Sequence, residues 1–447
     1  MNRDHALSRN DNGIQPISWS LIALAGIFFL IPIQLLPMPM QMDSVDLWTL
    51  FVMVVFWSFF LIGRQRVIGM SLGYMVAVWL VLFASVGSVF EAVNPRAGLV
   101  VLLKEVYLVA TWMTVATLLF QLNESNFRFA MRIWLATAVL HGLLIVAQFF
   151  STDIYDAIAS LGENTTDHKH YRPSGLFFSP AAGNANKAAM YQLMAFVPLF
   201  LAKPSRGIGL FSGLALLGSV LATGSMGTTL AFCCGLAASI AVIGIVGNRL
   251  LLMLRFSALA IVFAALMCGI IGIVISSTPA YQQHFQKILF GRVEKSSDGR
   301  FGLWQRGLET FRDSKTVVLG IGPENFRDID VLEKQLHNEP LAFSVERGLL
   351  GLLGLALMFA VASWRAIKLL QHEFASDGDG GMYAVVFVGA LAAVFMVSLT
   401  HQVFHAREIW LALAAQEAVI ARHGVFAVAR FHKLQDAPSS PCIGGAT

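Results

Sequence analysis

Apolar runs long enough to cross a bilayer recur along almost the whole chain, separated by polar stretches. A helix needs about 20 apolar residues to span roughly 30 Å of hydrocarbon. The pattern therefore predicts an all-α polytopic membrane protein with about twelve transmembrane helices. The expected spans are 17–37, 44–63, 67–92, 99–120, 129–150, 188–203, 207–223, 228–247, 250–276, 341–363, 383–400 and 405–422.

Composition supports a membrane protein. The 447 residues are 56% hydrophobic and 13% charged, whereas ordinary soluble domains carry about 25% charged residues. The first apolar run continues into further spans, so we expect it to act as an anchor and not as a cleaved signal peptide. The net charge of +4 gives no support for nucleic-acid binding.

Basic residues gather in alternate short loops, which are expected to face the cytoplasm. These residues are Arg64, Arg66, Arg128, Arg132, Lys203, Arg206, Arg249, Arg255, Arg365 and Lys368. Both termini are then cytoplasmic, and two long segments, 151–187 and 277–340, lie outside. The expected organisation is a nine-span bundle (1–276), an outer loop domain (277–340), a three-span unit (341–422) and a disordered tail (423–447).

The second outer segment contains the amphipathic sequence SSDGRFGLWQRGLETFRDS, with Ser297 or Asp298 as a helix N-cap. At 100° per residue one apolar face is expected to consist of Phe301, Trp304, Leu308 and Phe311. Arg306, Glu309 and Arg312 are expected to face solvent. Arg300 stands at the edge of the apolar face, where it either points toward a ligand or caps a carboxylate.

The first outer segment places Arg172 before Pro173 and Gly175, on a rigid turn near the membrane. It is a candidate anion contact, with an interfacial lipid-headgroup arginine as the alternative. Asp167, His168 and His170 precede it, but their spacing matches no specific zinc pattern, so we expect no metal there.

The stretch QLHNEPLAFSVERGLLG begins the expected span 341–363. Asn338 is a plausible N-cap, with Glu339 and Pro340 in the first turn. His337 would then stand at the positive end of the helix dipole, which disfavours an imidazolium. A neutral histidine at the membrane border suits a general base acting on a hydroxyl. A histidine that only bonds a loop carbonyl fits equally well.

Ionisable residues also occur within or at the ends of the spans: Glu91, Lys104, His141, Arg347 and His401. A charge at the centre of a lipid-facing helix costs about 2.5–3.5 kcal/mol, so such residues usually face the bundle or a water-filled cavity. The expected topology places all of them except the deeper His141 near the outer face. The basic members would form an anion site. The chain lacks a G-x-x-x-x-G-K-[ST] loop, which argues against ATP hydrolysis.

Four motifs resemble the bacterial O-antigen ligases of the O-antigen ligase/polymerase superfamily. They are RPSGLF (172–177), DGRFGLWQRGLE (298–309), GIGPENF (320–326) and HNEPLAFSVERGLLG (337–351). The resemblance covers residues 130–420 approximately and is most specific in the long outer segment. One departure is TGSMGTT (223–229), because relatives often carry an arginine where Met226 stands.

The resemblance implies a GT-C-like, inverting glycosyltransferase that uses no metal or other cofactor. Its donor would be a polysaccharide on undecaprenyl pyrophosphate and its acceptor lipid A-core, at the periplasmic face of the bacterial inner membrane. His337 would deprotonate the acceptor hydroxyl. Arg300 and Arg172, with Arg347 and Lys104 as further candidates, would neutralise the departing pyrophosphate. Asn338, Trp304, Glu346 and His401 would support them.

Three other functions are compatible with parts of the pattern. An O-antigen polymerase and a protein-O-oligosaccharyltransferase would use the same donor and a similar basic site. The short stretch after the last span favours the ligase over the protein-modifying enzyme. A transporter of lipid-linked sugars predicts polar residues through several span midplanes, whereas the ionisable residues here gather at one face.

Overall fold

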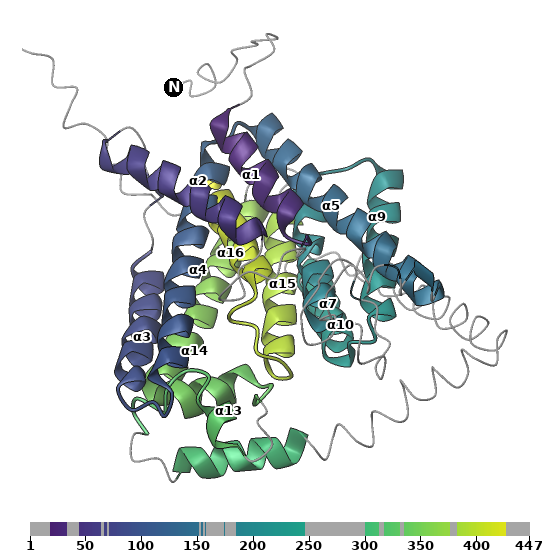
Figure 1. Cartoon of the computed structure of the whole chain (residues 1–447). Coiled ribbons are helices and arrows are strands. Elements are labelled where there is room, and N and C mark those ends of the chain that lie inside the picture. Colours follow the sequence, from purple (N-terminus) through teal and green to yellow (C-terminus); the bar gives the residue numbers. More distant parts are fainter. Residues whose placement is uncertain are drawn as a thin grey trace, which may run out of the picture.

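The computed structural model describes residues 18–33, 44–63, 67–68, 71–151, 153–154, 157, 174, 185–245, 300–312, 317–330, 335–375 and 382–425. Every regular element within these ranges is helical (Figure 1). The expected span 250–276, most of the two outer segments and nearly all of the tail lie outside the described residues.

Several of the helices are long and apolar enough to cross a membrane, as the sequence predicts. Within the described ranges, six qualify by length and composition: α2 (Ser44–Leu61), α3 (Leu72–Val89), α4 (Pro95–Gln121), α5 (Glu124–Phe150), α10 (Met226–Ile245) and α14 (Glu339–Ala375). Shorter apolar helices are α1 (Trp19–Leu30), α9 (Arg206–Ala222) and α15 (Met382–Ser398). The count of about twelve spans remains a prediction.

The expected span 188–203 differs from the structure, which has two consecutive helices, α7 (Ala185–Met194) and α8 (Phe196–Leu201). Pro198 lies in the first turn of α8 and has no N–H to donate to the carbonyl of the preceding turn. Ala195, between the two helices, is assigned to a turn. The final described helix is α16 (Arg407–His423).

The helix bundle is held by close pairs with small residues at their contacts. The most extensive pairs are α14 with α3, α10 with α15, and α16 with α4. A Cβ on Gly354 would lie 2.9 Å from the backbone nitrogen of Val81, and one on Gly235 would lie 2.7 Å from the carbonyl oxygen of Gly389. Small residues let membrane helices approach in this way, so that dispersion contacts hold them together.

The segments that flank these helices meet at one end of the molecule. The turn between α3 and α4 bonds the outer segment there, because the backbone N–H of Asn94 donates to Oδ1 of Asn325 at 2.6 Å. At the same end the helical residues 300–312 lie below α13 (Phe326–Ile329), at the bottom of Figure 1. A separate small core holds this region on the bundle: Leu303, Phe326, Leu336, Ala342 and Val345.

Candidate functional site

A sharp break in α14 shapes the candidate site. Gly348 has φ 65° and ψ −168°, a conformation essentially restricted to glycine. A short helix, residues 339–347, therefore precedes the break, and a longer one, residues 349–375, follows it. The sequence predicted one continuous span over 341–363, which is wrong at this point.

The segment 317–322 satisfies the backbone groups that the break exposes. The N–H groups of residues 321–322 donate to the carbonyls of residues 345–346 at 3.1 and 2.9 Å. The N–H groups of residues 349–350 donate to the carbonyls of residues 317–318 at 2.9 and 3.2 Å. One turn thus caps the end of the short helix and the beginning of the long one, which is what free helix termini require.

Two glycines make this close approach possible. A Cβ on Gly348 would lie 2.2 Å from the carbonyl oxygen of Val318, and one on Gly320 would lie 2.5 Å from the backbone nitrogen of Arg347. Gly320 itself has φ 77°. The GIGP motif (320–323) therefore packs against the α14 break. This contact restricts its sequence more than a turn on the surface would.

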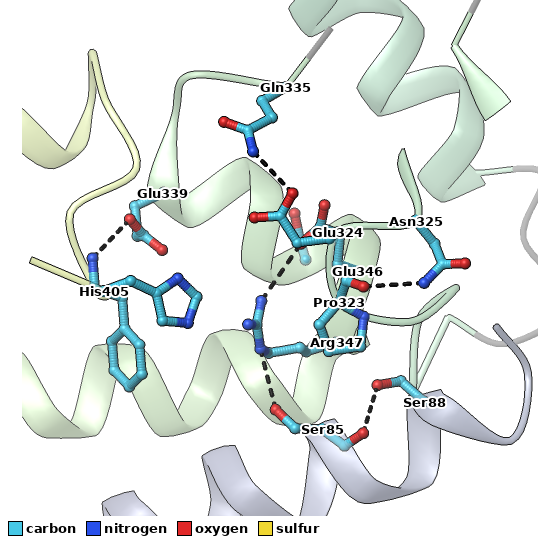
Figure 2. Close-up of polar contacts among 12 residues, drawn as sticks. Ser85, Ser88, Pro323, Glu324, Asn325, Gln335, Glu339, Glu346, Arg347 and His405 are labelled. Carbon is cyan, nitrogen blue, oxygen red and sulfur yellow. Dashed lines mark hydrogen bonds and ion pairs between the residues drawn. The ribbon is translucent and has the colours of Figure 1, made fainter. Parts of the chain in front are cut away.

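The break places Arg347 in a buried ionic cluster with Glu105 of α4. Its side chain is 2% exposed and that of Glu105 is 1% exposed. The Arg347 Nε donates to Oε1 of Glu105 and to Oγ of Ser85, both at 3.1 Å, and Nη2 also contacts Glu105. Nη1 lies 3.5 Å from Oε2 of Glu346 (Figure 2).

These contacts bear on the predicted role of Arg347. Its guanidinium also lies 4.3 Å from the ring centroid of Phe343. The donors of Arg347 are thus directed to protein carboxylates, and a charge-assisted pair of this kind orients both partners. The structure supports a role for Arg347 in holding the short helix of α14 against α3 and α4.

The loop between α15 and α16, residues 399–406, is tied to the start of α14. The Asn338 side chain donates to the carbonyl of Leu399 at 3.0 Å. A carboxylate oxygen of Glu339 accepts from the backbone N–H groups of Val403 and Phe404, the latter at 3.0 Å. Asn338 also accepts from the Leu341 N–H at 2.9 Å, which is the N-cap bond expected from the sequence.

His337 directly precedes this cap. It is half-buried and has φ 48°, a left-handed conformation uncommon in a non-glycine residue. The indole N–H of Trp304 donates to the carbonyl of Leu336 at 3.0 Å and so fixes the residue before it. His337 therefore lies between two anchored residues, directly before the Asn338 cap that the sequence predicted.

The helix at residues 300–312 packs on a different face from the one expected. Leu303 and Gly307 are its buried residues, whereas Phe301 is 66% and Leu308 is 46% exposed. A Cβ on Gly307 would lie 2.6 Å from the Leu336 side chain, so the glycine allows this close contact. The prediction counted large apolar residues and missed that a glycine can mark the contact face.

Arg306 also differs from the expectation of a solvated residue. Its Nε donates to Oδ1 of Asp330 at 2.8 Å, and the Asp330 side chain is 1% exposed. This ion pair joins the 300–312 helix to the segment after α13. Arg300 is half-buried at the first described turn of the same helix, and its predicted anion contact stays untested.

Lys104 lies one residue before Glu105 and is exposed. The charges that act on it come from Lys187 of α7 and Arg407 of α16, and also from the acidic Glu324 and Asp46. Arg407 pairs with Asp46 of α2 at 2.6 Å. This arrangement is compatible with the predicted anion site, and Lys187 is an additional candidate.

The remaining predicted residues are distributed as follows. Nδ1 of His401 lies 3.0 Å from Oγ1 of Thr400, and its ring is adjacent to Gly227 at the start of α10. The neighbouring Met226 is 55% exposed. His141 is buried, and its Nδ1 lies 2.9 Å from the Gln192 amide nitrogen. Arg172 lies outside the described residues.

Sequence reasoning missed Glu105, His405 and the bridging role of Glu339. Glu105 stands beside Lys104 in an otherwise apolar span, and that pair of opposite charges was an available signal. The role of Glu339 depends on backbone groups of a distant loop, for which the sequence holds no local signal. Within the described residues, no three His, Cys, Asp or Glu side chains are placed to hold a metal ion.

Part of the chain matches a known protein family. Residues 210–356, which include α10, the outer segment 277–340 and the α14 break, match the family model described as O-antigen ligase. No curated protein matches the chain. The matched stretch is similar to the O-antigen ligase family and includes His337 and Arg347, whereas Glu105 and His405 lie outside it.

Proposed function

We propose that the chain is an O-antigen ligase. It transfers a polysaccharide from undecaprenyl pyrophosphate to a sugar hydroxyl of lipid A-core, at the periplasmic face of the inner membrane. The observation that carries the proposal is the family match over residues 210–356. It is supported by the position of His337 directly before the Asn338 cap, at the end of the bundle where the α3–α4 turn meets the outer segment. Apolar helices around that end suit two lipid-linked substrates.

The proposed reaction is a single displacement. His337 takes the proton of the acceptor hydroxyl, and the oxygen attacks the anomeric carbon of the donor. The bond from that carbon to the phosphate oxygen breaks, and its electron pair leaves on the pyrophosphate. The anomeric configuration inverts. The asparagine cap next to His337 begins a helix whose N-terminal dipole disfavours the imidazolium, so the ring is ready to accept a proton.

Basic residues would neutralise the leaving group. We assign this role to Arg300, Arg172 and Lys104, and we assign to Arg347 the positioning of the short helix through Glu105. Loss of one charge-assisted contact to a developing anion costs about 10²–10³ in rate. Because the donor carries its own activation, the reaction needs no ATP.

The test is transfer by purified protein with defined lipids. Three reactions contain the lipid-linked donor with lipid A-core, the donor alone, or the donor with an acceptor protein. A ligase gives glycosylated lipid A-core. Longer lipid-linked glycans from donor alone would indicate a polymerase, and glycosylated protein would indicate an oligosaccharyltransferase. A wild-type protein that is folded yet inactive in all three reactions would exclude the proposal.

A further inference from the structure

The α15–α16 loop places His405 beside the buried Arg347–Glu105 pair. Its Nε2 lies 3.5 Å from Oε1 of Glu105. Figure 2 shows its ring between Glu339 and Arg347. The bonds from Val403 and Phe404 to Glu339 fix the two residues before it. The position of His405 is therefore set by α4 and α14 as well as by its own loop.

The neighbouring carboxylate orients the imidazole. Nε2 is buried and has no hydrogen-bond partner at closer range among the described residues. A proton on Nε2 directed toward Glu105 is the favourable tautomer beside a carboxylate. Glu105 cannot turn away, because Ser85 donates to its Oε2 at 2.7 Å and Arg347 holds its Oε1. The lone pair then remains on Nδ1, the other ring nitrogen.

The surroundings also keep this ring neutral. Burial lowers the pKa of His405 below its ordinary value, Glu105 opposes that shift, and the charges of Lys104 and Arg347 add to it. Among the described residues, Lys104 and Glu105 of α4 and Arg347 of α14 act on the His405 ring, and Glu339 of α14 bonds the loop itself. Arg407 follows in α16. A side chain that is 20% exposed and neutral can offer Nδ1 as a hydrogen-bond acceptor.

We propose that His405 is a sugar-binding residue whose Nδ1 accepts a hydrogen bond from a substrate hydroxyl. This inference rests on the proposed function. A phosphate requires donors, so an acceptor nitrogen beside a carboxylate does not suit it. A sugar hydroxyl supplies the missing donor. The hydroxyl can belong to the acceptor sugar or to the donor sugar, and kinetics separate these sources.

The test uses two substitutions in the full chain, with undecaprenyl-pyrophosphate polysaccharide and lipid A-core as probes. His405→Phe keeps a ring but removes the acceptor atom, whereas His405→Asn places an amide oxygen near the Nδ1 position. A neutral hydrogen bond made in both ground and transition states changes KM with little change in kcat. We expect His405→Phe to raise KM about three- to tenfold for one substrate, and His405→Asn to recover most of the loss.

The substrate whose KM rises identifies the source of the hydroxyl. An unchanged KM for both substrates in a folded His405→Phe protein overturns the inference. If KM rises equally in both variants and their melting temperatures fall, His405 has a structural role only, and this result also overturns the inference. An inactive wild-type protein would instead contradict the proposed function, so the two failures are distinguishable.

A pH series tests the same inference on the wild-type protein alone. Protonation converts Nδ1 from acceptor to donor, so the same wild-type KM should rise as pH falls through the pKa of His405, which burial holds below the ordinary histidine value. A wild-type KM that does not change with pH contradicts the inference.

Discussion

Because of the break in α14, we expect replacement of Gly348 to lower the free energy of unfolding substantially. In Gly348→Ala the new Cβ meets the Val318 carbonyl oxygen at 2.2 Å, and the residue must keep φ 65° and ψ −168°. Backbone strain in this region costs about 1–3 kcal/mol. The same carbonyl accepts the Leu350 N–H, and losing that bond adds about 1 kcal/mol. We expect a total loss of about 2–4 kcal/mol in the free energy of unfolding.

The assay is unfolding of the purified protein in mixed micelles, titrated with a denaturing detergent. The matched control is Gly213→Ala in α9, where the added Cβ would lie at an ordinary 3.8 Å from the Leu199 side chain. In a helix interior, alanine is about 1 kcal/mol more favourable than glycine. If Gly348→Ala and Gly213→Ala unfold at the same detergent fraction, the account of the break is wrong.

Four further predictions follow from the site. Arg347→Met leaves Glu105 buried and unpaired and should cost about 3–5 kcal/mol in the free energy of unfolding. The double variant with Glu105→Leu should recover much of it, and additive losses would contradict the pairing. Glu339→Ala frees two backbone N–H groups of the α15–α16 loop and should cost about 1–3 kcal/mol. Glu339→Gln keeps an acceptor oxygen and should lose less, so equal losses would refute the tie. Trp304→Phe removes the bond to the Leu336 carbonyl and should lower kcat severalfold in the transfer assay, whereas an unchanged kcat would show that the bond does not position His337. A chelator should leave transfer unaffected. A loss of transfer that added metal reverses would contradict a metal-independent reaction.

The helical character of the chain and the presence of membrane-spanning helices were predictable from sequence. Runs of apolar residues give helices in a membrane because backbone groups there must bond internally. The cap at Asn338 has a local chemical signal, and the structure confirms it. Lys104 precedes Glu105, which pairs with Arg347 inside the bundle, in agreement with the expectation that charges in spans avoid lipid.

The break at Gly348 was not predictable from periodicity. Its sequence continues an apolar run, and only contact with the 317–322 turn explains the change of direction. The contact face of the 300–312 helix was missed for a related reason, because Gly307 contributes no apolar surface of its own yet permits the closest contact. The Glu339 tie joins residues more than sixty positions apart and depends on tertiary structure alone.

The most direct test of the proposed chemistry compares wild type with His337→Ala in the purified transfer assay with lipid A-core. Both proteins must show equal membrane levels and equal melting temperatures. The proposed role predicts a loss of about 10²-fold or more in kcat, because a positioned general base contributes about 10²–10⁴-fold. Transfer by a folded His337→Ala protein at close to the wild-type rate would contradict it.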